Sequence, residues 1–138
     1  MPYVVKAAIS NTAARRFSFD AQKTMYGGKL IRPKDEVFIF ASENEGGPGL
    51  IARGVVTSVV GPSPKRGPKK VRVTPRVSIV VRRVGTAQRR FGRSELKGFR
   101  RWDDGKPETE IAFKFYRQAT NKLGGISDAA AAFLRSFF

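Results

Sequence analysis

Few side chains in this sequence could perform acid–base or metal chemistry. The 138 residues include no Cys and no His. This excludes thiolate catalysis, zinc sites that depend on Cys, Ser-His-Asp triads and His-dependent nuclease centres. The carboxylates that remain could hold hydrated Mg²⁺ during phosphodiester cleavage. A Mg-dependent nuclease that uses Asp103 and Asp104 is therefore one interpretation of the chain, and the weakest of three.

The spacing of the acidic cluster argues against a nuclease. The cluster consists of Asp103, Asp104, Glu108 and Glu110. A Pro-Asp…Glu-x-Lys core needs a Lys two residues after its Glu, and those positions hold Glu110 and Ala112. We interpret residues 103–107 as an acidic turn that balances Arg100 and Arg101. The sequence therefore predicts a protein that is not an enzyme and that binds no metal and no cofactor.

Cations are concentrated in the middle of the chain. The whole chain has 27 Lys and Arg against 11 Asp and Glu, which gives a net charge of +16. Residues 61–101 hold 14 of these cations and a single acid, Glu95, whereas the rest of the chain is nearly balanced. A polyanion that neutralises such a band releases condensed counterions, and this release dominates sequence-independent affinity for nucleic acid. We therefore predict a nucleic acid, either DNA or RNA, as the partner.

Most of the residues that we expect to contact phosphates belong to this band. They are Lys65, Arg66, Lys69, Lys70, Arg72, Arg82, Arg83, Arg89, Arg90, Arg100, Arg101 and Arg117. Anionic lipid is a rival partner, but a lipid-binding segment usually combines a basic helix with an apolar stripe or an anchor, and neither is visible. The longest apolar runs are far shorter than the roughly 18 residues of a membrane helix. No apolar leader is evident, so we expect no membrane association and a cytoplasmic location.

The elements that would position these side chains are mostly strands. Apolar and β-branched patterns predict strands over residues 3–9, 35–42, 50–60, 71–84 and 109–116. Gly47, Pro48 and Gly49 predict the turn of a hairpin. A short helix is expected over 20–26, and a C-terminal helix with an apolar stripe is expected from Ser127.

A single domain, residues 1–138, accounts for this order of elements. The Pro- and Gly-rich residues 61–70 are expected to form a basic loop between two strands of one sheet. Short strands in so small a chain usually close into a barrel, because closure removes unpaired edges. The predicted fold is mainly β (α+β): a small β-barrel with flanking short helices and a C-terminal helix.

Two strings of the sequence resemble the PUA-like superfamily, and within it the EVE-type domain. Residues 27–40 resemble its turn followed by an Asp-x-Val-Phe strand, here Asp35 to Phe38. Residues 115–127 resemble its closing strand, Arg-Gln-x-x-Asn loop and helix. The resemblance implies a PUA-like barrel with a pocket beside it that accepts a flipped base, often a modified one such as methylated cytosine. It also implies that any nuclease would be a separate domain or protein, since a chain without His holds no HNH centre.

A flipped-base pocket needs flat rings for stacking and planar donors and acceptors for the base edge. The residues that we expect to form it are Ser10, Asn11, Phe17, Phe19, Tyr26, Trp102, Tyr116, Gln118 and Asn121. Trp102 follows Arg100 and Arg101, a grouping that could stack on a base and bind a phosphate. Asn11 and Asn121 could instead be turn residues, and Phe17, Phe19 and Tyr26 could instead belong to the core. An RNA-binding protein that has no pocket and uses only charge and stacking is the main alternative.

Overall fold

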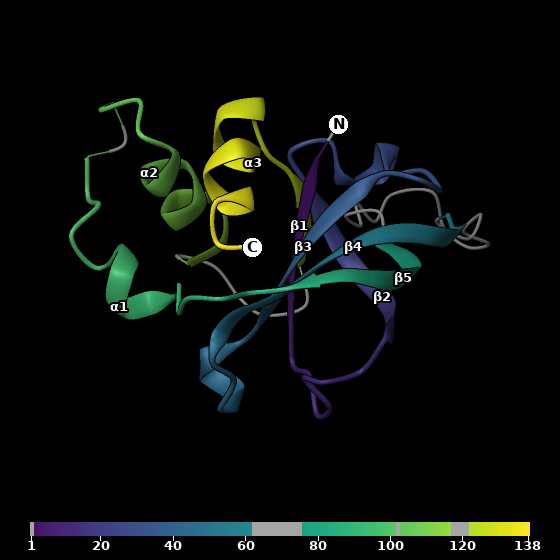
Figure 1. Ribbon diagram of the computed structural model, residues 1–138. Coiled ribbons are helices and arrows are strands. Elements are labelled where there is room, and N and C mark those ends of the chain that lie inside the picture. Colours follow the sequence, from purple (N-terminus) through teal and green to yellow (C-terminus); the bar gives the residue numbers. More distant parts are fainter. Residues whose placement is uncertain (1, 62–75, 102, 117–121) are drawn as a thin grey trace.

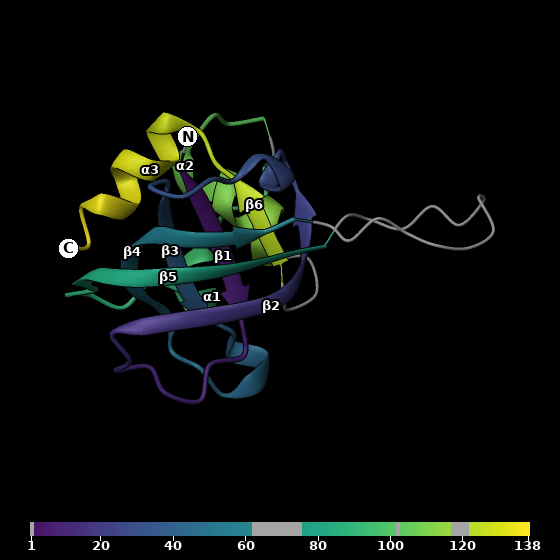
Figure 2. The same ribbon diagram turned by 90° about the vertical axis from the view of Figure 1, so that its right-hand side faces the viewer.

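In the computed structural model of the chain, the described residues are 2–61, 76–101, 103–116 and 122–138, and their strands close into a barrel (Figure 1). The strands are β1 (Tyr3–Ala7), β2 (Arg16–Met25), β3 (Glu36–Ala41), β4 (Gly49–Val60), β5 (Arg76–Thr86) and β6 (Lys122–Gly125). Their order around the barrel is β1-β3-β4-β5-β2-β6. Figure 2 shows β4, β5 and β2 side by side. The predicted β-barrel is confirmed.

Short helices flank this barrel. They are η1 (Gly28–Leu30), η2 (Glu43–Glu45), α1 (Arg93–Leu96), α2 (Pro107–Ile111), the π-helix η3 (Ala112–Tyr116) and α3 (Asp128–Arg135). The helices α1, α2 and α3 lie together beside the strands (Figure 1). The Ser127 hydroxyl accepts a hydrogen bond from the Ala130 N–H at 3.1 Å, so the predicted start of the C-terminal helix is confirmed. No helix among the described residues is both long enough and apolar enough to cross a membrane.

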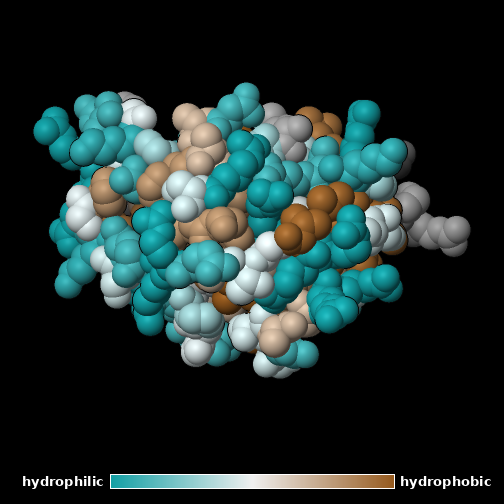
Figure 3. Space-filling model, viewed as in Figure 1, coloured by the Kyte–Doolittle hydropathy of each residue, from teal (hydrophilic) through white to brown (hydrophobic). Residues whose placement is uncertain are grey.

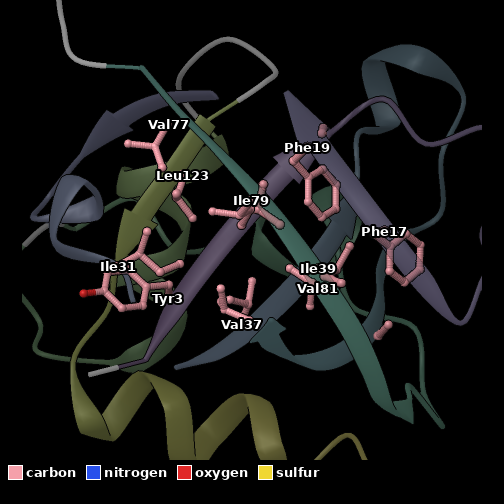
Figure 4. Close-up of a cluster of buried hydrophobic side chains, with 14 of the residues drawn as sticks. Tyr3, Phe17, Phe19, Ile31, Val37, Ile39, Val77, Ile79, Val81 and Leu123 are labelled. Atoms are coloured by element: carbon pink, nitrogen blue, oxygen red, sulfur yellow. The ribbon is translucent and has the colours of Figure 1, made fainter. Parts of the chain in front are cut away.

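The apolar residues form two cores that share β1 and β3. Side chains such as Phe17, Ile39 and Val81 fill the barrel interior (Figure 4). Phe38 and Leu134 belong to a second core between the barrel wall and the helices. Because β1 and β3 separate the two cores, nearly every residue in them is buried, which explains their continuous apolar sequences.

The predicted hairpin is also confirmed. β3 pairs with β4 in antiparallel fashion, from Glu36 opposite Val55 to Ala41 opposite Gly49. The loop between them contains η2 and Gly47. A Cβ at Gly47 would lie 2.6 Å from the backbone oxygen of Ala41, so this close turn needs glycine.

The helix expected over residues 20–26 is wrong, because β2 continues through this segment as far as Met25. The register against β5 shifts between Phe19 and Gln22, and Ala21 has a positive φ of 49°. Phe17 and Phe19 point into the barrel before this bulge, whereas the inward parity afterwards falls on Gln22 and Thr24. The extra residue therefore breaks the period-two pattern that would identify a strand.

The strand expected over residues 109–116 is wrong as well. Pro107 begins α2, and the chain continues as η3 to Tyr116. Ile111, Ala112 and Phe115 are buried, a helical spacing that the alternation of apolar residues concealed. The closing strand is instead β6, four residues with two glycines and little β-propensity.

Two of the predicted elements fall partly outside the described residues. Residues 62–75 contain most of the predicted basic loop and the beginning of the strand expected over 71–84. The described part of that strand is β5, in which Val77, Ile79 and Val81 point into the core and Arg76 and Arg82 are exposed, as predicted.

Candidate nucleic-acid interface

A cavity between α1 and η3 combines aromatic rings with cations. It encloses about 450 Å³ and is lined by Arg93, Ser94, Leu96, Lys97, Phe99, Arg100, Ala112 and Tyr116. Arg93, Lys97 and Arg100 recur at helical spacing along α1 and the residues after it. A flat ligand can stack on the rings of Phe99 and Tyr116 while a phosphate binds the cations.

Contacts from three directions position the Tyr116 ring in this cavity. Phe40 packs edge-on against it with the ring centres 5.9 Å apart. The ammonium of Lys6 lies 4.2 Å from the ring centre and donates a hydrogen bond to the Phe115 carbonyl at 3.1 Å. Burial and the neighbouring carboxylate of Glu43 raise the pKa of the Tyr116 hydroxyl far above its usual value. The hydroxyl therefore stays protonated at neutral pH.

Glu43 connects this cavity with the beginning of α1. One carboxylate oxygen accepts a hydrogen bond from the backbone N–H of Arg93 at 2.6 Å, and the other lies 3.8 Å from the Arg90 guanidinium. A Cβ at Gly92 would approach the Glu43 carboxylate to 2.4 Å, so a side chain there would displace that carboxylate. The N–H of Gly92 in turn donates to the Glu95 carboxylate at 2.7 Å. These contacts hold the cation-bearing wall against the barrel.

A second cavity lies at Tyr26 and has a different charge. It encloses about 340 Å³ and is lined by Tyr26, Gly105, Lys106, Thr109, Glu110, Phe113 and Lys114. The ammonium of Lys114 lies 4.9 Å from the Tyr26 ring centre but is paired with Glu110 at 3.1 Å and with the Gly125 carbonyl at 3.0 Å. Because its lysine is already paired and a carboxylate lines its wall, this cavity suits a polyanion less well.

The predicted pocket residues separate into several places. Tyr116 lines the first cavity and Tyr26 the second. Phe17 and Phe19 stack on each other inside the barrel and are each 4% exposed, so the prediction that they form a pocket wall is wrong. Alternation along β2 directs both rings inward. Trp102, Gln118 and Asn121 lie outside the described residues.

Ser10 and Asn11 lie in the exposed loop between β1 and β2. The side chain of Asn11 accepts a hydrogen bond from the backbone N–H of Ala13 at 3.1 Å, which is the turn role that the sequence left open. Neither residue lines the cavity at Tyr116. The structure therefore does not bring them together with Tyr116.

Six of the residues predicted to contact phosphates lie in the described part of the chain. Arg100 lines the first cavity, and Arg82 and Arg83 line a groove on the barrel. Arg89 donates to the Ser136 carbonyl at 3.0 Å, and Arg101 lies 4.0 Å from Asp103. Figure 3 shows that hydrophilic side chains cover most of one face, with apolar patches between them.

Arg90 is the sixth described member and pairs with Glu43. Lys65, Arg66, Lys69, Lys70, Arg72 and Arg117 lie outside the described residues.

Two carboxylates of the acidic cluster accept hydrogen bonds at the beginnings of helices. The Asp104 carboxylate accepts hydrogen bonds from the Lys106 N–H at 3.0 Å and from the Thr109 hydroxyl at 2.9 Å, and these bonds lower its pKa. Glu110 accepts from both the N–H and the hydroxyl of Ser127. Among the described residues, no three Asp or Glu side chains gather as a metal site would require. These carboxylates thus have structural partners at the beginnings of α2 and α3.

Several residues of the first cavity are absent from the sequence prediction. Lys6 and Glu43 belong to segments distant in sequence, and no local pattern connects them with Tyr116. Phe99, Arg93 and Lys97 did offer a signal together with Arg100, which was predicted to contact phosphates. Their spacing of four and three residues matches one face of a helix, which the emphasis on strands concealed.

Comparison with known proteins identifies the fold. No family model and no curated protein sequence matches the chain. The structure of human THYN1 protein in complex with 5-methylcytosine containing DNA superposes with a TM-score of 0.66 at 17% identity, over 98% of this chain and 95% of that chain. The DUF55 domain of human thymocyte nuclear protein 1 gives a TM-score of 0.65 at 16% identity, over 99% and 97%. A protein from Pseudomonas putida gives 0.61 at 15% identity, over 99% of both chains.

Each of these three superpositions covers nearly the full length of both chains that are compared. They include the barrel together with the helices beside it, since they cover 98% or more of this chain. The chain therefore has the small PUA-like fold that its sequence resemblance implied.

Proposed function

We propose that the chain is a non-catalytic nucleic-acid-binding module that accepts one flipped base in the cavity between α1 and η3. The observation that carries this proposal is the cavity itself, in which Phe99 and Tyr116 lie among Arg93, Lys97 and Arg100. Its volume of about 450 Å³ is within the usual range for a small-ligand site. A ring for stacking and cations for the flanking phosphates are the two requirements of a flipped nucleotide.

Two further observations support this function. The net charge of +16 favours a polyanionic partner. A protein of the same fold, human THYN1, was solved in complex with 5-methylcytosine containing DNA. We therefore extend the proposal to a modified base, with methylated cytosine as the first candidate.

A binding series tests the proposal. Matched duplex and single-stranded oligonucleotides of DNA and RNA, with and without 5-methylcytosine or 5-hydroxymethylcytosine, are titrated across a range of salt. We expect a preference for one modified oligonucleotide that persists at high salt, because stacking depends less on ions than phosphate contacts do. Phe99→Ala should weaken binding of that oligonucleotide by about 1–3 kcal/mol.

Two variants separate this cavity from its alternatives. Tyr116→Leu removes the aromatic ring from the wall of the first cavity, so discrimination between bases should fall. Tyr26→Ala removes an aromatic ring from the second cavity and is the matched control, which should leave discrimination unchanged. If no oligonucleotide is preferred and Phe99→Ala changes nothing, the base cavity is excluded. Binding that then fades steeply with salt would support the charge-driven alternative.

A further inference from the structure

A groove on the barrel surface collects four arginines. Arg15 and Arg16 come from the beginning of β2, and Arg82 and Arg83 come from β5. The groove encloses about 510 Å³ and continues over Val84, Gly85 and Thr86. It is separate from the base cavity, with which it shares no lining residue.

The arginines of this groove repel one another in the free protein. Arg16 lies directly opposite Arg82 in the β2–β5 ladder, and both side chains are exposed. Like charges at opposed positions destabilise a sheet. Among the described residues, no carboxylate forms an ion pair with Arg15, Arg16 or Arg82. An external anion would remove this repulsion.

Arg83 has a different role, because its guanidinium is committed to the protein. It donates to the Ala14 carbonyl and to the Thr86 hydroxyl, both at 2.8 Å, and also to the Thr12 carbonyl. Its backbone N–H donates to the Arg15 carbonyl at 2.8 Å. Arg83 thus fixes the loop that presents Arg15 and Arg16, and it leaves three arginines available for a ligand.

A shallow depression and an ion pair lie between this groove and the base cavity. A shallow depression lined by Thr86, Gln88, Arg89 and Arg90, among others, shares Thr86 with the groove. Arg90 at its other end pairs with Glu43, the carboxylate that holds the N–H of Arg93 in the cavity wall. Arg93 comes seven positions after Thr86, so the chain between them spans at most about 25 Å. That distance equals roughly seven nucleotides along one strand of B-form DNA.

We propose that the arginine groove binds the backbone phosphates of the strand whose base occupies the cavity, on one side of that base only. The inference rests on the proposed function and adds a direction to it. Phosphates next to the base contact Arg93, Lys97 and Arg100. Phosphates several nucleotides away reach Arg16 and Arg82 by the path over residues 86–90.

Oligonucleotides of increasing length test this direction. The preferred base is placed in a short strand and then flanked by eight further nucleotides on its 5′ side only or on its 3′ side only. For the wild-type protein, one of the two extensions should raise affinity at least fivefold more than the other. In Arg16→Ala/Arg82→Ala this additional gain should disappear, and the salt slope for the favoured extension should fall by about two.

A matched control removes the same charge elsewhere. Lys29 and Arg32 are exposed and follow the far end of β2. Lys29→Ala/Arg32→Ala should retain the one-sided gain. Circular dichroism confirms that both double variants are folded before binding is compared.

The possible failures are distinguishable. Equal gain from both extensions, or a gain that survives in Arg16→Ala/Arg82→Ala, would overturn the directional groove while the base cavity stands. If the groove fails in this way but Phe99→Ala still abolishes the preference for the modified base, the proposed function remains supported. Wild-type protein that binds no oligonucleotide with a base preference would instead overturn the proposed function.

Discussion

Two buried lysines hold the end of the π-helix that carries Tyr116. The ammonium of Lys6 donates to the Phe115 carbonyl, and that of Lys122 donates to the Lys114 carbonyl. Both side chains are only 2% exposed. Cations suit this position, because the last carbonyls of a helix lack partners within the helix. The cavity wall therefore depends on two amines from β1 and β6.

The first residue-scale prediction concerns Lys122 and pH. Burial, together with Lys23 and Lys6, lowers the pKa of Lys122 from 10.5 to about 8. Between these values the folded protein binds fewer protons than the unfolded chain, so this group makes the free energy of unfolding rise with pH. Lys122→Met removes that dependence. Urea unfolding at pH 7 to 10 should show wild type gaining stability relative to the variant above about pH 8.

An exposed lysine supplies the control for this prediction. Lys29→Met also removes one ammonium but leaves the buried pair intact. Its stability should run parallel to that of wild type over the same pH range. If the stability of Lys122→Met also runs parallel to that of wild type, the Lys122 amine has the same pKa in the folded and unfolded states.

The second residue-scale prediction concerns Glu110 at acid pH. Burial alone would raise the pKa of this carboxyl, but hydrogen bonds from Ser127 and Lys114 outweigh burial and lower it below 4.5. The carboxylate therefore stabilises the fold above its unfolded pKa, and the contribution is lost as pH falls through the lower, folded value. Glu110→Gln should reduce the melting temperature at pH 7, and the difference should shrink below about pH 4.5.

Glu45→Gln makes the same charge change at an exposed position. It should have little effect on the melting temperature at either pH. If the melting temperature of Glu110→Gln stays below that of wild type by the same amount down to pH 3, the loss of stability does not come from the lost charge.

At the scale of elements, Gly92 controls where α1 begins. A side chain there would collide with the Glu43 carboxylate, which is already held by the Arg93 N–H and by Arg90. Gly92→Ala should therefore displace Glu43, lower stability by about 1–3 kcal/mol, and weaken binding of the preferred base. Thermal unfolding and oligonucleotide titration measure the two effects.

Gly98 offers a matched substitution on the same segment. A Cβ at Gly98 would meet nothing within 4 Å. Gly98→Ala should leave both stability and binding close to wild type. If Gly92→Ala behaves in the same way, the contact between Glu43 and α1 does not support the cavity.

The elements that sequence predicts well are those with one uninterrupted pattern. β3, β4 and α3 each have a regular apolar period together with a turn or a cap, and all three lie where they were expected. β2 was missed because the bulge at Ala21 shifts its parity, and β6 because it is short and contains two glycines. Such features depend on the partner strand, which local propensity does not describe.

The candidate site was predictable only in part, for a related reason. Tyr116 and Arg100 were singled out as an aromatic residue and a cation suited to nucleic acid, and both line the cavity. Lys6 and Glu43 reach Tyr116 through the closure of the barrel and the packing of helices against it. These contacts join segments more than 70 residues apart. Composition can identify the partner class, whereas tertiary packing determines which side chains meet.

At the scale of the whole molecule, the excess of cations has opposite consequences for folding and for binding. A net charge of +16 on 138 residues favours association with a polyanion but destabilises the compact state through self-repulsion. The opposed Arg16 and Arg82 are a local instance of that repulsion. Salt should therefore act on the free protein and on its complex in opposite directions.

The last prediction uses this opposition. Raising NaCl from about 0.05 to about 1 M shortens the Debye length severalfold, so the melting temperature of the free protein should rise. A bound oligonucleotide raises the melting temperature by mass action at low salt, and this increment should decline as phosphate contacts weaken. Any increment that remains at high salt reports contacts other than charge. It should be larger for the preferred modified base than for the unmodified one, and Phe99→Ala should remove that difference. Equal residual increments for both oligonucleotides would attribute all binding to the cationic surface.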